Sequence, residues 1–461
     1  MSPLPSHRRL RKRKQSYIDP PGINRAQRVE RLAVPGLRRE LQVVASGLQE
    51  ARLVICHIEP TTIHDRELAV SLFARGMTLA RQTGNRTLEI QLLRTKMVDA
   101  AHYGPDQDAY EAGEAAISAA RAESSFIQLA TVLNDYATHL RLSGQQPLAQ
   151  GYAEEARALF RSQNNLPLLA DNLAQQAWSD LHQMKFNSAL SMADQSIELC
   201  HEINNNWNLC LAYQTKAQVK AAIGDWGDAI LLFEQAIAFG QESDLALARV
   251  MPTNLLGDLL RTIGHIERAE ALHRAAHAIA EKDVPFLVHA LEAQLAMNAY
   301  ARNRIAAGDQ WLDAARDHQP VGAIGRAWCT LPDIARAAVM SAEKNARWQD
   351  AANLTQAALD EAQERALPLH IPPLLLAQSR CRIARDQFQA AETVLEEAAD
   401  MTTSPILHPI WWQIHQLRAQ LRRQQNRVAE AQQHDRLALA ERSRLATSLG
   451  DSELVSTLLA A

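Results

Sequence analysis

Apolar and small residues recur at helical spacing after a short polar turn in the stretch Gly224–Ala236. Trp226, Ala229 and Phe233 lie three or four positions apart, so they share one face of a helix. The alanine among larger neighbours lets the backbone of another helix approach closely. Gly224-Asp225 is a turn signal. The stretch therefore predicts the end of one helix, a tight turn and the start of a second helix.

The same arrangement recurs every forty residues. The series of alanines at this interval is interrupted once: Ala69, Ala109, Ala149, Ala189, Ala229, Ala269, Ala351, Ala391 and Ala431. A second small residue follows each of them by seven positions: Gly76, Ala116, Ala156, Ser196, Ala236, Ala276, Ala358, Ala398 and Ala438. A helical hairpin repeated at a fixed period predicts an array whose units pack on their neighbours, here about ten units.

The turn positions and one break in the series add detail. Among the six alanines from Ala69 to Ala269, four are preceded by a glycine at five positions, and Met184 stands there before Ala189: Gly104, Gly144, Gly224 and Gly264. From Ala269 to Ala351 the interval is 82 residues, which is two units plus two. Within it, Gly308 stands four positions beyond the place where the series expects its turn glycine. We therefore expect an irregular repeat at 301–331, with a loop at 320–325.

Prolines are expected near the starts of helices, where their missing N–H removes no helical hydrogen bond. Several fall at such places: Pro147, Pro252, Pro332, Pro372, Pro373 and Pro409. This signal agrees with the forty-residue series without depending on it.

Each unit combines a turn residue, two small residues and a bulky residue three positions before the repeating alanine. This combination resembles the tetratricopeptide repeat. The bulky position is filled by Phe186, Trp226, Ile266, Trp348, Phe388 and Val428. The resemblance covers roughly residues 50–440 and is to the long-period repeats of MalT-like bacterial regulators. It implies an all-α fold, a right-handed α-solenoid of helix-turn-helix repeats. The forty-residue period exceeds the common 34 and overlaps that of HEAT units, which lack the turn-plus-alanine signature.

The predicted domain organisation follows from these intervals. It comprises a basic disordered leader at 1–24, an N-terminal helical cap at 25–68, regular repeats at 69–300, the irregular repeat at 301–331, further repeats at 332–445 and a C-terminal capping helix at 446–461.

Composition narrows the class of protein. Residues 1–52 carry 12 Lys and Arg against 4 Asp and Glu, so the remainder of this chain of net charge −4 is acidic. Five scattered cysteines without a paired spacing favour reduced thiols in a cytoplasmic protein. We expect no membrane span, because no apolar run approaches the ~20 residues that a bilayer requires. The basic run Arg8–Lys14 could contact nucleic acid, although a solvated tail is the commoner explanation of such a run.

The sequence lacks a phosphate-binding glycine loop, a nucleophile elbow and a C-terminal DNA-binding helix-turn-helix. We therefore expect no enzyme activity and no cofactor. His273 and His277 are spaced for one helical face, as zinc ligands can be, but a third ligand at motif spacing is missing. Because His273 fills the position that Phe233 holds one unit earlier, packing is the favoured interpretation and no metal is expected.

A partner-binding surface is predicted on the first helices of the repeats. Polar residues and one tryptophan recur there in pairs four positions apart: Asn134 and Thr138, Trp178, Gln214 and Gln218, Asn254 and Asp258, Gln294 and Asn298. The family resemblance implies that first helices line a concave groove. Amides both donate and accept hydrogen bonds, which suits an extended peptide, and Trp178 would supply an apolar anchor. The alternatives are a solvated face, or binding at the convex face or near Trp207.

The favoured function is a non-catalytic scaffold that binds a protein or peptide, acting as a sensor or adaptor array in a bacterial-type signalling pathway. One alternative is a nucleic-acid-associated regulator that uses the basic leader. Another is an enzyme with its site in the irregular repeat. The sequence leaves the partner and the oligomeric state open.

Overall fold

The computed structural model describes residues 66–243, 245–317, 330–403 and 407–460. The predicted leader at 1–24, the cap up to residue 65 and the loop at 320–325 lie outside these ranges. The chain divides into two compact units, residues 1–88 and 89–461. The first unit contributes α4 (Arg66–Gln82) and the start of α5 (Arg86–Tyr103).

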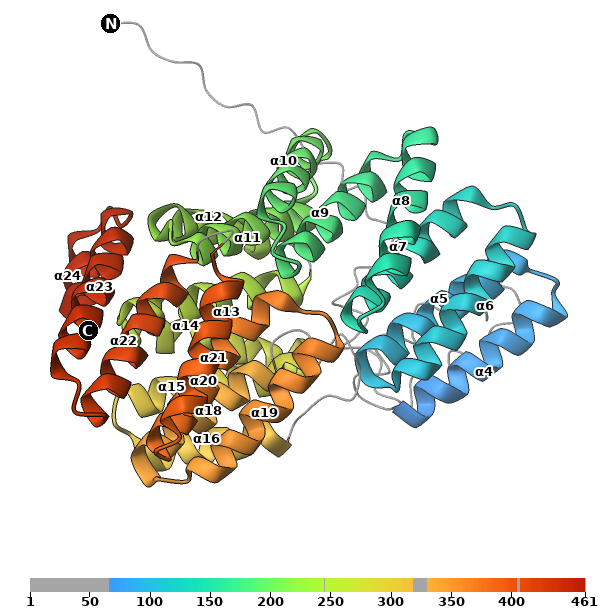
Figure 1. The fold of residues 1–461 in the computed structure, drawn as a ribbon. Helices are drawn as coiled ribbons and strands as arrows, with labels where there is room; N and C mark the ends of the chain where they lie inside the picture. The colour runs from blue at the N-terminus through green and yellow to red at the C-terminus, as the bar shows by residue number, and fades with distance from the viewer. Residues whose placement is uncertain (1–65, 244, 318–329, 404–406, 461) are drawn as a thin grey trace, which may run out of the picture. The chain divides into compact units, whose positions relative to one another are not determined.

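The elements of the described ranges are helices that follow one another as hairpins (Figure 1). After α5, the first helices of the hairpins are α7 (Phe126–Leu142), α9 (Leu166–His182), α11 (Asn206–Ile223), α13 (Ala246–Ile263), α15 (Val288–Ala301), α18 (Thr330–Asn345), α20 (Ile371–Ala384) and α22 (His408–Gln424). The second helices are α6 (Asp106–Ala122), α8 (Gln146–Ser162), α10 (Phe186–Ile203), α12 (Trp226–Gln241), α14 (Ile266–Asp283), α16 (Ile305–Asp317), α19 (Trp348–Glu364), α21 (Phe388–Met401) and α23 (Val428–Thr447). Short 3₁₀ helices, η1 (Pro285–Leu287) and η2 (Pro368–His370), precede α15 and α20, and α24 (Ser452–Ala460) comes last. The all-α solenoid of tetratricopeptide-like hairpins is confirmed.

The first helices form the inner layer of the second unit. They contact the first helices of neighbouring hairpins, as α9 contacts α11 and α15 contacts α18. Second helices contact chiefly the first helices on either side of them. In a curved two-layer array, the helices on the inside of the curve are closer together than those on the outside. Contacts between successive first helices therefore place these helices on the inside. The predicted polar pairs on first helices therefore belong to the inner layer.

Left-handed residues end most helices, at intervals of about twenty positions. Gly144, Gly224 and Gly264 have φ of 85°, 92° and 106° at turns within hairpins. Met184 takes φ 57°, so the exception in the glycine series keeps the same turn geometry. The links between hairpins use this conformation too, at Ser124, Asn164, Asn204 and Ala366. A left-handed residue after the last helical turn lets backbone N–H groups reach the free carbonyls and stops the helix.

The small positions of the forty-residue series lie at helix contacts, as expected. Ala149, Ala189 and Ala229 are completely buried. The other alanines of the series, and the small residues that follow each by seven positions, are buried as well. Their burial confirms that the repeating alanines mark close helix packing.

The irregular repeat differs from the expectation in its details. Gly308 lies within α16, where an added Cβ would come within 2.4 Å of the Tyr300 ring, so it is not a displaced turn residue. The turn before it is at Asn303, with φ 58°. Gly308 fills the small position of its repeat, and buried Ala315 follows seven residues later. The forty-residue pattern of alanines did not identify this repeat, because its small position holds a glycine.

Pro252 also departs from the expectation. It lies inside α13 rather than at its start. A proline there cannot donate to the carbonyl four residues earlier, which belongs to Ala248. That carbonyl instead accepts from Cys210 Sγ at 3.3 Å, and Gly240 lies so close that an added Cβ would be 2.1 Å from the oxygen. A neighbouring hairpin thus uses the group that the proline leaves free.

The second unit folds back so that early hairpins contact late ones. The Trp226 N–H donates to Ser448 Oγ at 3.0 Å, and the Trp226 ring lies edge-on to Trp412. Gly227 sits against the Ser448 carbonyl, which would be 2.0 Å from an added Cβ. More than 180 residues of sequence separate the two sides of this contact.

Two further contacts extend the same interface. Gln183 Nε2 donates to the Ala366 carbonyl at 2.7 Å, and Arg365 Nη1 donates to the Leu142 carbonyl at 2.8 Å. One link between late hairpins therefore touches the turns of two consecutive early hairpins. We call the whole interface the seam, formed by residues 142–144, 182–184 and 224–227 on one side and 364–370, 408–412 and 445–449 on the other.

Candidate binding surface on the inner helices

The structure places the predicted site residues on five consecutive first helices, from α7 to α15. Six of them are buried: Asn134, Trp178, Gln214, Asn254, Gln294 and Asn298. Thr138, Gln218 and Asp258 are partly exposed. The polar pairs therefore face inward, but most of their hydrogen-bonding groups lie beneath the surface.

At the early end, the amides are used within the protein. Asn134 Nδ2 donates to Asp171 Oδ2 at 2.9 Å, and Asn172 Nδ2 donates to Asn134 Oδ1 at the same distance. Desolvation, with help from the charge of Asp135, raises the pKa of Asp171 to about 7. Thr138 Oγ1 donates to the Asn134 carbonyl within its own helix. This group ties α7 to α9.

Trp178 is 5% exposed and packs among Leu142, Ala174 and Leu211. Its ring lies 4.1 Å, centroid to centroid, from that of His182. A side chain so placed offers almost no surface to a partner. The structure thus gives Trp178 a position in the core between α7, α9 and α11, and an anchoring role would require its release.

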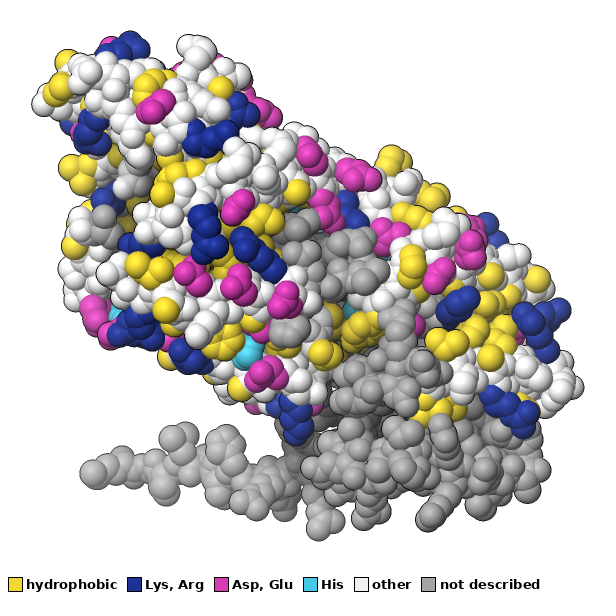
Figure 2. All heavy atoms as spheres, turned by 90° about the horizontal axis from the view of Figure 1, so that it is seen from below, with side chains coloured by type: hydrophobic (Ala, Val, Ile, Leu, Met, Phe, Trp, Pro, Cys, Tyr) yellow, Lys and Arg dark blue, Asp and Glu magenta, His cyan; other side chains and the backbone are white. Residues whose placement is uncertain are grey.

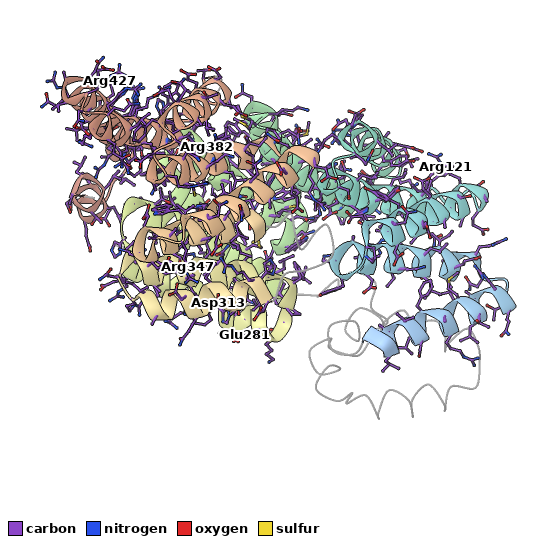
Figure 3. The ribbon with its side chains drawn as sticks, turned by 60° about the horizontal axis from the view of Figure 1, so that its bottom comes forward. Arg121, Glu281, Asp313, Arg347, Arg382 and Arg427 are labelled. Atoms are coloured by element: carbon purple, nitrogen blue, oxygen red, sulfur yellow. The ribbon has the colours of Figure 1, made fainter. Side chains whose placement is uncertain are left out.

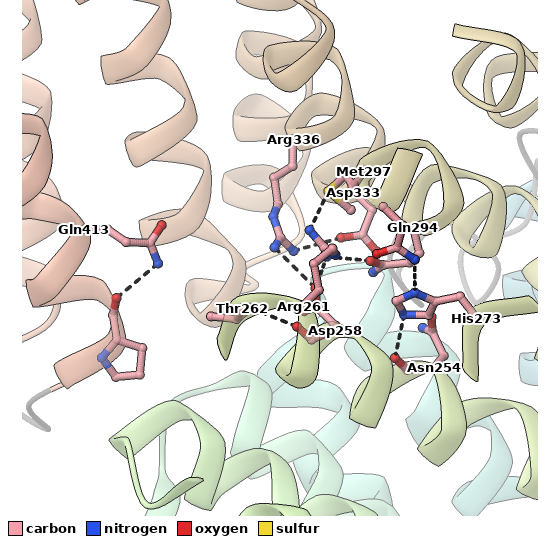
Figure 4. A network of polar contacts seen from close by, with 12 residues as sticks. Asn254, Asp258, Arg261, Thr262, His273, Gln294, Met297, Asp333, Arg336 and Gln413 are labelled. Atoms are coloured by element: carbon pink, nitrogen blue, oxygen red, sulfur yellow. Dashed lines mark hydrogen bonds and ion pairs between the residues drawn. The ribbon is translucent and has the colours of Figure 1, made fainter. Parts of the chain in front are cut away.

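Farther along, Asp258 and Gln294 belong to one cluster with three residues that the sequence analysis did not single out (Figure 4). The Arg261 guanidinium pairs with Asp258 and donates to Gln294 Oε1 at 2.7 Å. Gln294 Nε2 donates to Asp333 Oδ2 at 3.0 Å. We call Asp258, Arg261, Gln294, Asp333 and Arg336 the charge cluster.

Arg336 closes the charge cluster across a whole hairpin. Its Nη1 donates to Asp333 Oδ1 at 3.2 Å and its Nη2 to Asp258 Oδ1 at 3.4 Å. The second contact joins α18 to α13, past the intervening α15. The cluster therefore joins three successive first helices, α13, α15 and α18.

The two carboxylates of the charge cluster differ electrostatically. Desolvation opposes ionisation of Asp258, but the Arg336 and Arg261 guanidiniums outweigh it and lower the Asp258 pKa. Desolvation dominates at Asp333 and raises its pKa, although Arg336 acts in the opposite direction. Of the two, Asp258 is the firmly ionised group.

Water reaches one side of the charge cluster. The side chains of Asp258 and Arg336 are 30% and 29% exposed, whereas those of Arg261 and Asp333 are each 8% exposed. Asp258 and Arg336 are therefore the part of the cluster that a partner could touch directly, and the other two charges support them from below.

His273 connects the cluster region to Asn254 and Asn298. His273 Nε2 lies 3.1 Å from the Asn254 carbonyl, so it carries the proton, and Asn298 Nδ2 donates to His273 Nδ1 at 2.7 Å. Desolvation lowers the His273 pKa to about 3, which keeps the ring neutral. With both ring nitrogens occupied, the geometry favours packing over metal ligation for His273.

The sequence held a signal for the missed residues. Arg261 follows Asp258 by three positions, and Arg336 follows Asp333 by three, so each pair shares a helix face. The break in the forty-residue series hid their relation, because counting from α13 across α16 gives the wrong register for α18.

The rest of the surface gives less indication of a site. Figure 2 shows one face on which acidic, basic and apolar side chains are interspersed. Figure 3 shows Arg121 and Arg427 on hairpins far apart from each other, and Asp313 close to Arg347. In the described ranges, no helix combines the length and apolar character that crossing a bilayer would need.

No protein-family model and no curated protein matches the sequence. Four solved structures of similar fold are tetratricopeptide-repeat proteins. One is a Rap protein complexed with Competence and Sporulation Factor, at TM-score 0.48 and 12% identity over 78% of this chain and 99% of that one. Another is a STAND signal-transduction ATPase with a tetratricopeptide-repeat sensor from Pyrococcus horikoshii, at TM-score 0.41 and 12% identity over 76% and 52%.

Yeast Tom70 is similar at TM-score 0.36 and 13% identity, over 94% of this chain and 91% of that chain. All three TM-scores lie below 0.5. The specific curvature, the seam and the charge cluster are described from the structure of this chain.

Proposed function

We propose that this chain is a non-catalytic scaffold whose inner layer of first helices binds an extended peptide or a helix of a protein partner. The observation that supports this best is the charge cluster, which spans three first helices of that layer and leaves Asp258 and Arg336 open to water. Curved helical arrays present side chains from several consecutive units to one elongated partner. A sensor or adaptor role in a bacterial-type signalling pathway is the setting we propose.

Contact with such a partner would be distributed over several hairpins. Partly exposed Thr138, Gln218 and Asp258 would make direct contacts, and the buried amides would hold their helices in place. An amide hydrogen bond contributes roughly 0.5–1.5 kcal/mol net, so single substitutions of these residues should weaken binding only a few-fold.

The proposal is tested by capturing a partner with the intact chain and measuring backbone hydrogen exchange of the complex. Exchange should slow in α11, α13, α15 and α18. The matched variants are Gln218→Ala on the inner layer and Arg121→Gln on α6 of the outer layer, where Arg121 pairs with Glu155. The first should weaken capture and the second should not. Protection confined to second helices would overturn the proposal.

A further inference from the structure

The arginines of the charge cluster have more hydrogen-bond donors than the cluster has acceptors. A guanidinium carries five N–H donors. Arg261 Nη2 serves Asp258 and Gln294, but its Nη1 contacts only the weakly accepting thioether of Met297. Its buried Nε has no acceptor in the described part of the chain. The site thus contains a 92% buried guanidinium whose donors are incompletely used.

The acceptors of the charge cluster are also shared. Asp258 Oδ1 takes contacts from both Arg261 and Arg336, and the second is long at 3.4 Å. The charged and titratable groups that surround this point are Asp258, Arg261, Asp333 and Arg336, with neutral His273 beside them. An additional acceptor oxygen would therefore satisfy donors that Asp258 serves only in part.

Two buried amide oxygens next to the charge cluster lack hydrogen-bond donors. Asn254 Oδ1 and Asn298 Oδ1 have no donor among the described residues, and their side chains are at least nine-tenths buried. Buried acceptors are normally paired within the folded protein or with ordered water. Both side chains lie too deep for a partner to reach, so the incompletely used guanidinium donors alone indicate a ligand that carries an anionic group.

Building on the proposed function, we propose that Arg261 and Arg336 bind a carboxylate of the partner peptide, which takes the place of the Asp258 carboxylate. The exchange is feasible because Asp258 is 30% exposed and can turn toward water while Arg336, at 29%, remains approachable. A guanidinium binds a carboxylate through two parallel N–H groups, which an incoming group can use fully. Asp258 then acts as an internal competitor for the partner.

The test uses the full-length chain and synthetic N-acetylated random pentapeptides, made as one pool with a free C-terminal carboxylate and one with a C-terminal amide. Peptides retained by the immobilised protein are sequenced by mass spectrometry. In the amide pool, retained peptides should be rich in Asp and Glu. Stronger retention of the acid pool, without such enrichment in the amide pool, would assign the carboxylate to the peptide terminus.

Variants separate this inference from its rivals. Arg336→Gln should weaken retention of carboxylate peptides roughly tenfold, because a hydrogen bond to a charged group is lost. Asp258→Asn should strengthen it, since the internal competitor is removed. Arg121→Gln should change nothing. Thermal unfolding of each variant checks that the protein remains folded.

Several outcomes would overturn the inference. Enrichment of Lys and Arg, with weaker retention by Asp258→Asn, would assign the cluster to a cationic partner. Retention without any charge preference would leave the proposed scaffold function standing and refute the carboxylate site. No retention of either pool by the folded protein would count against both.

Discussion

Two turns at the same place in the repeat, 224–227 and 426–429, share a backbone conformation and differ in their surroundings. Gly224 has φ 92° and Asn426 has φ 61°, and a second helix begins two residues after each. Trp226 at the first turn is 1% exposed, whereas Val428 at the second is 60% exposed. The first turn is covered by the seam, and the second belongs to the last hairpin of the series.

The side chains at the two turns follow from this difference. An added Cβ at Gly224 would come within 2.6 Å of Leu445 Cδ2, and one at Gly227 within 2.0 Å of the Ser448 carbonyl. At the last hairpin the same positions hold Asn426 and Ala429. Glycine at the covered turn is therefore required by a long-range contact, in addition to the left-handed conformation at Gly224.

The largest expected effect comes from the residue three before the repeating alanine. Trp226→Ala should lower the free energy of unfolding by about 3–5 kcal/mol, because it removes a fully buried aromatic side chain from the seam. Val428→Ala at the uncovered turn should stay within about 0.5 kcal/mol. Chemical denaturation of both variants measures the difference. Equal effects would show that the seam does not stabilise the protein.

Gly227→Ala should cost about 1–3 kcal/mol or more, because the new methyl group meets a backbone carbonyl that cannot rotate away. The control is Gly151→Ala in α8, where nothing lies within 4 Å of an added Cβ. That variant should be stabilised by roughly 0.5–1 kcal/mol through higher helix propensity. A harmless Gly227→Ala would mean that the seam is looser than its geometry indicates.

Acid should weaken the seam, because two of its histidines are buried. Desolvation lowers the pKa of His182 to about 4 and of His370 to about 3, and the two rings lie 5.4 Å apart. In the unfolded chain both histidines bind protons near pH 6.5. Their burial therefore leaves the free energy of unfolding unchanged above that pH and lowers it as the pH drops toward 4. The slope is at most about 1.4 kcal/mol per pH unit for each histidine.

Unfolding midpoints measured between pH 7.5 and pH 4.5 test this dependence. The variant His370→Gln should flatten the profile relative to the parent chain, with His201→Gln on α10 as an exposed control. A profile that stays the same in both variants would assign the acid sensitivity to other groups.

The smallest expected effect is at the uncovered turn itself. Asn426→Gly relieves the cost of a left-handed side chain but adds freedom to the unfolded chain, and the two terms nearly cancel. The free energy of unfolding, measured by thermal unfolding, should therefore change by no more than about 0.5 kcal/mol. A large loss of stability would reveal a contact of the Asn426 side chain that matters to the last hairpin.

The candidate site was only partly predictable. The amide pairs on first helices identified Asp258 and Gln294, because residues four apart on one helix share a face. Their partners Asp333 and Arg336 lie beyond the irregular repeat, where the forty-residue register no longer applies. The sequence also could not show that Trp178 lies in the core, since an aromatic residue on a first helix packs equally well in a groove or between helices.

The sequence by itself determined the hairpins, their period and the residues at which helices pack. Those features are local: each depends on helical spacing and on a small residue beside a neighbour at most one unit away. Tertiary structure decided the seam and the charge cluster. Both join hairpins that are not adjacent in sequence, and their positions depend on how the small rotations between successive hairpins add up. That sum is a property of the whole array, and it cannot be deduced from the sequence of any single repeat.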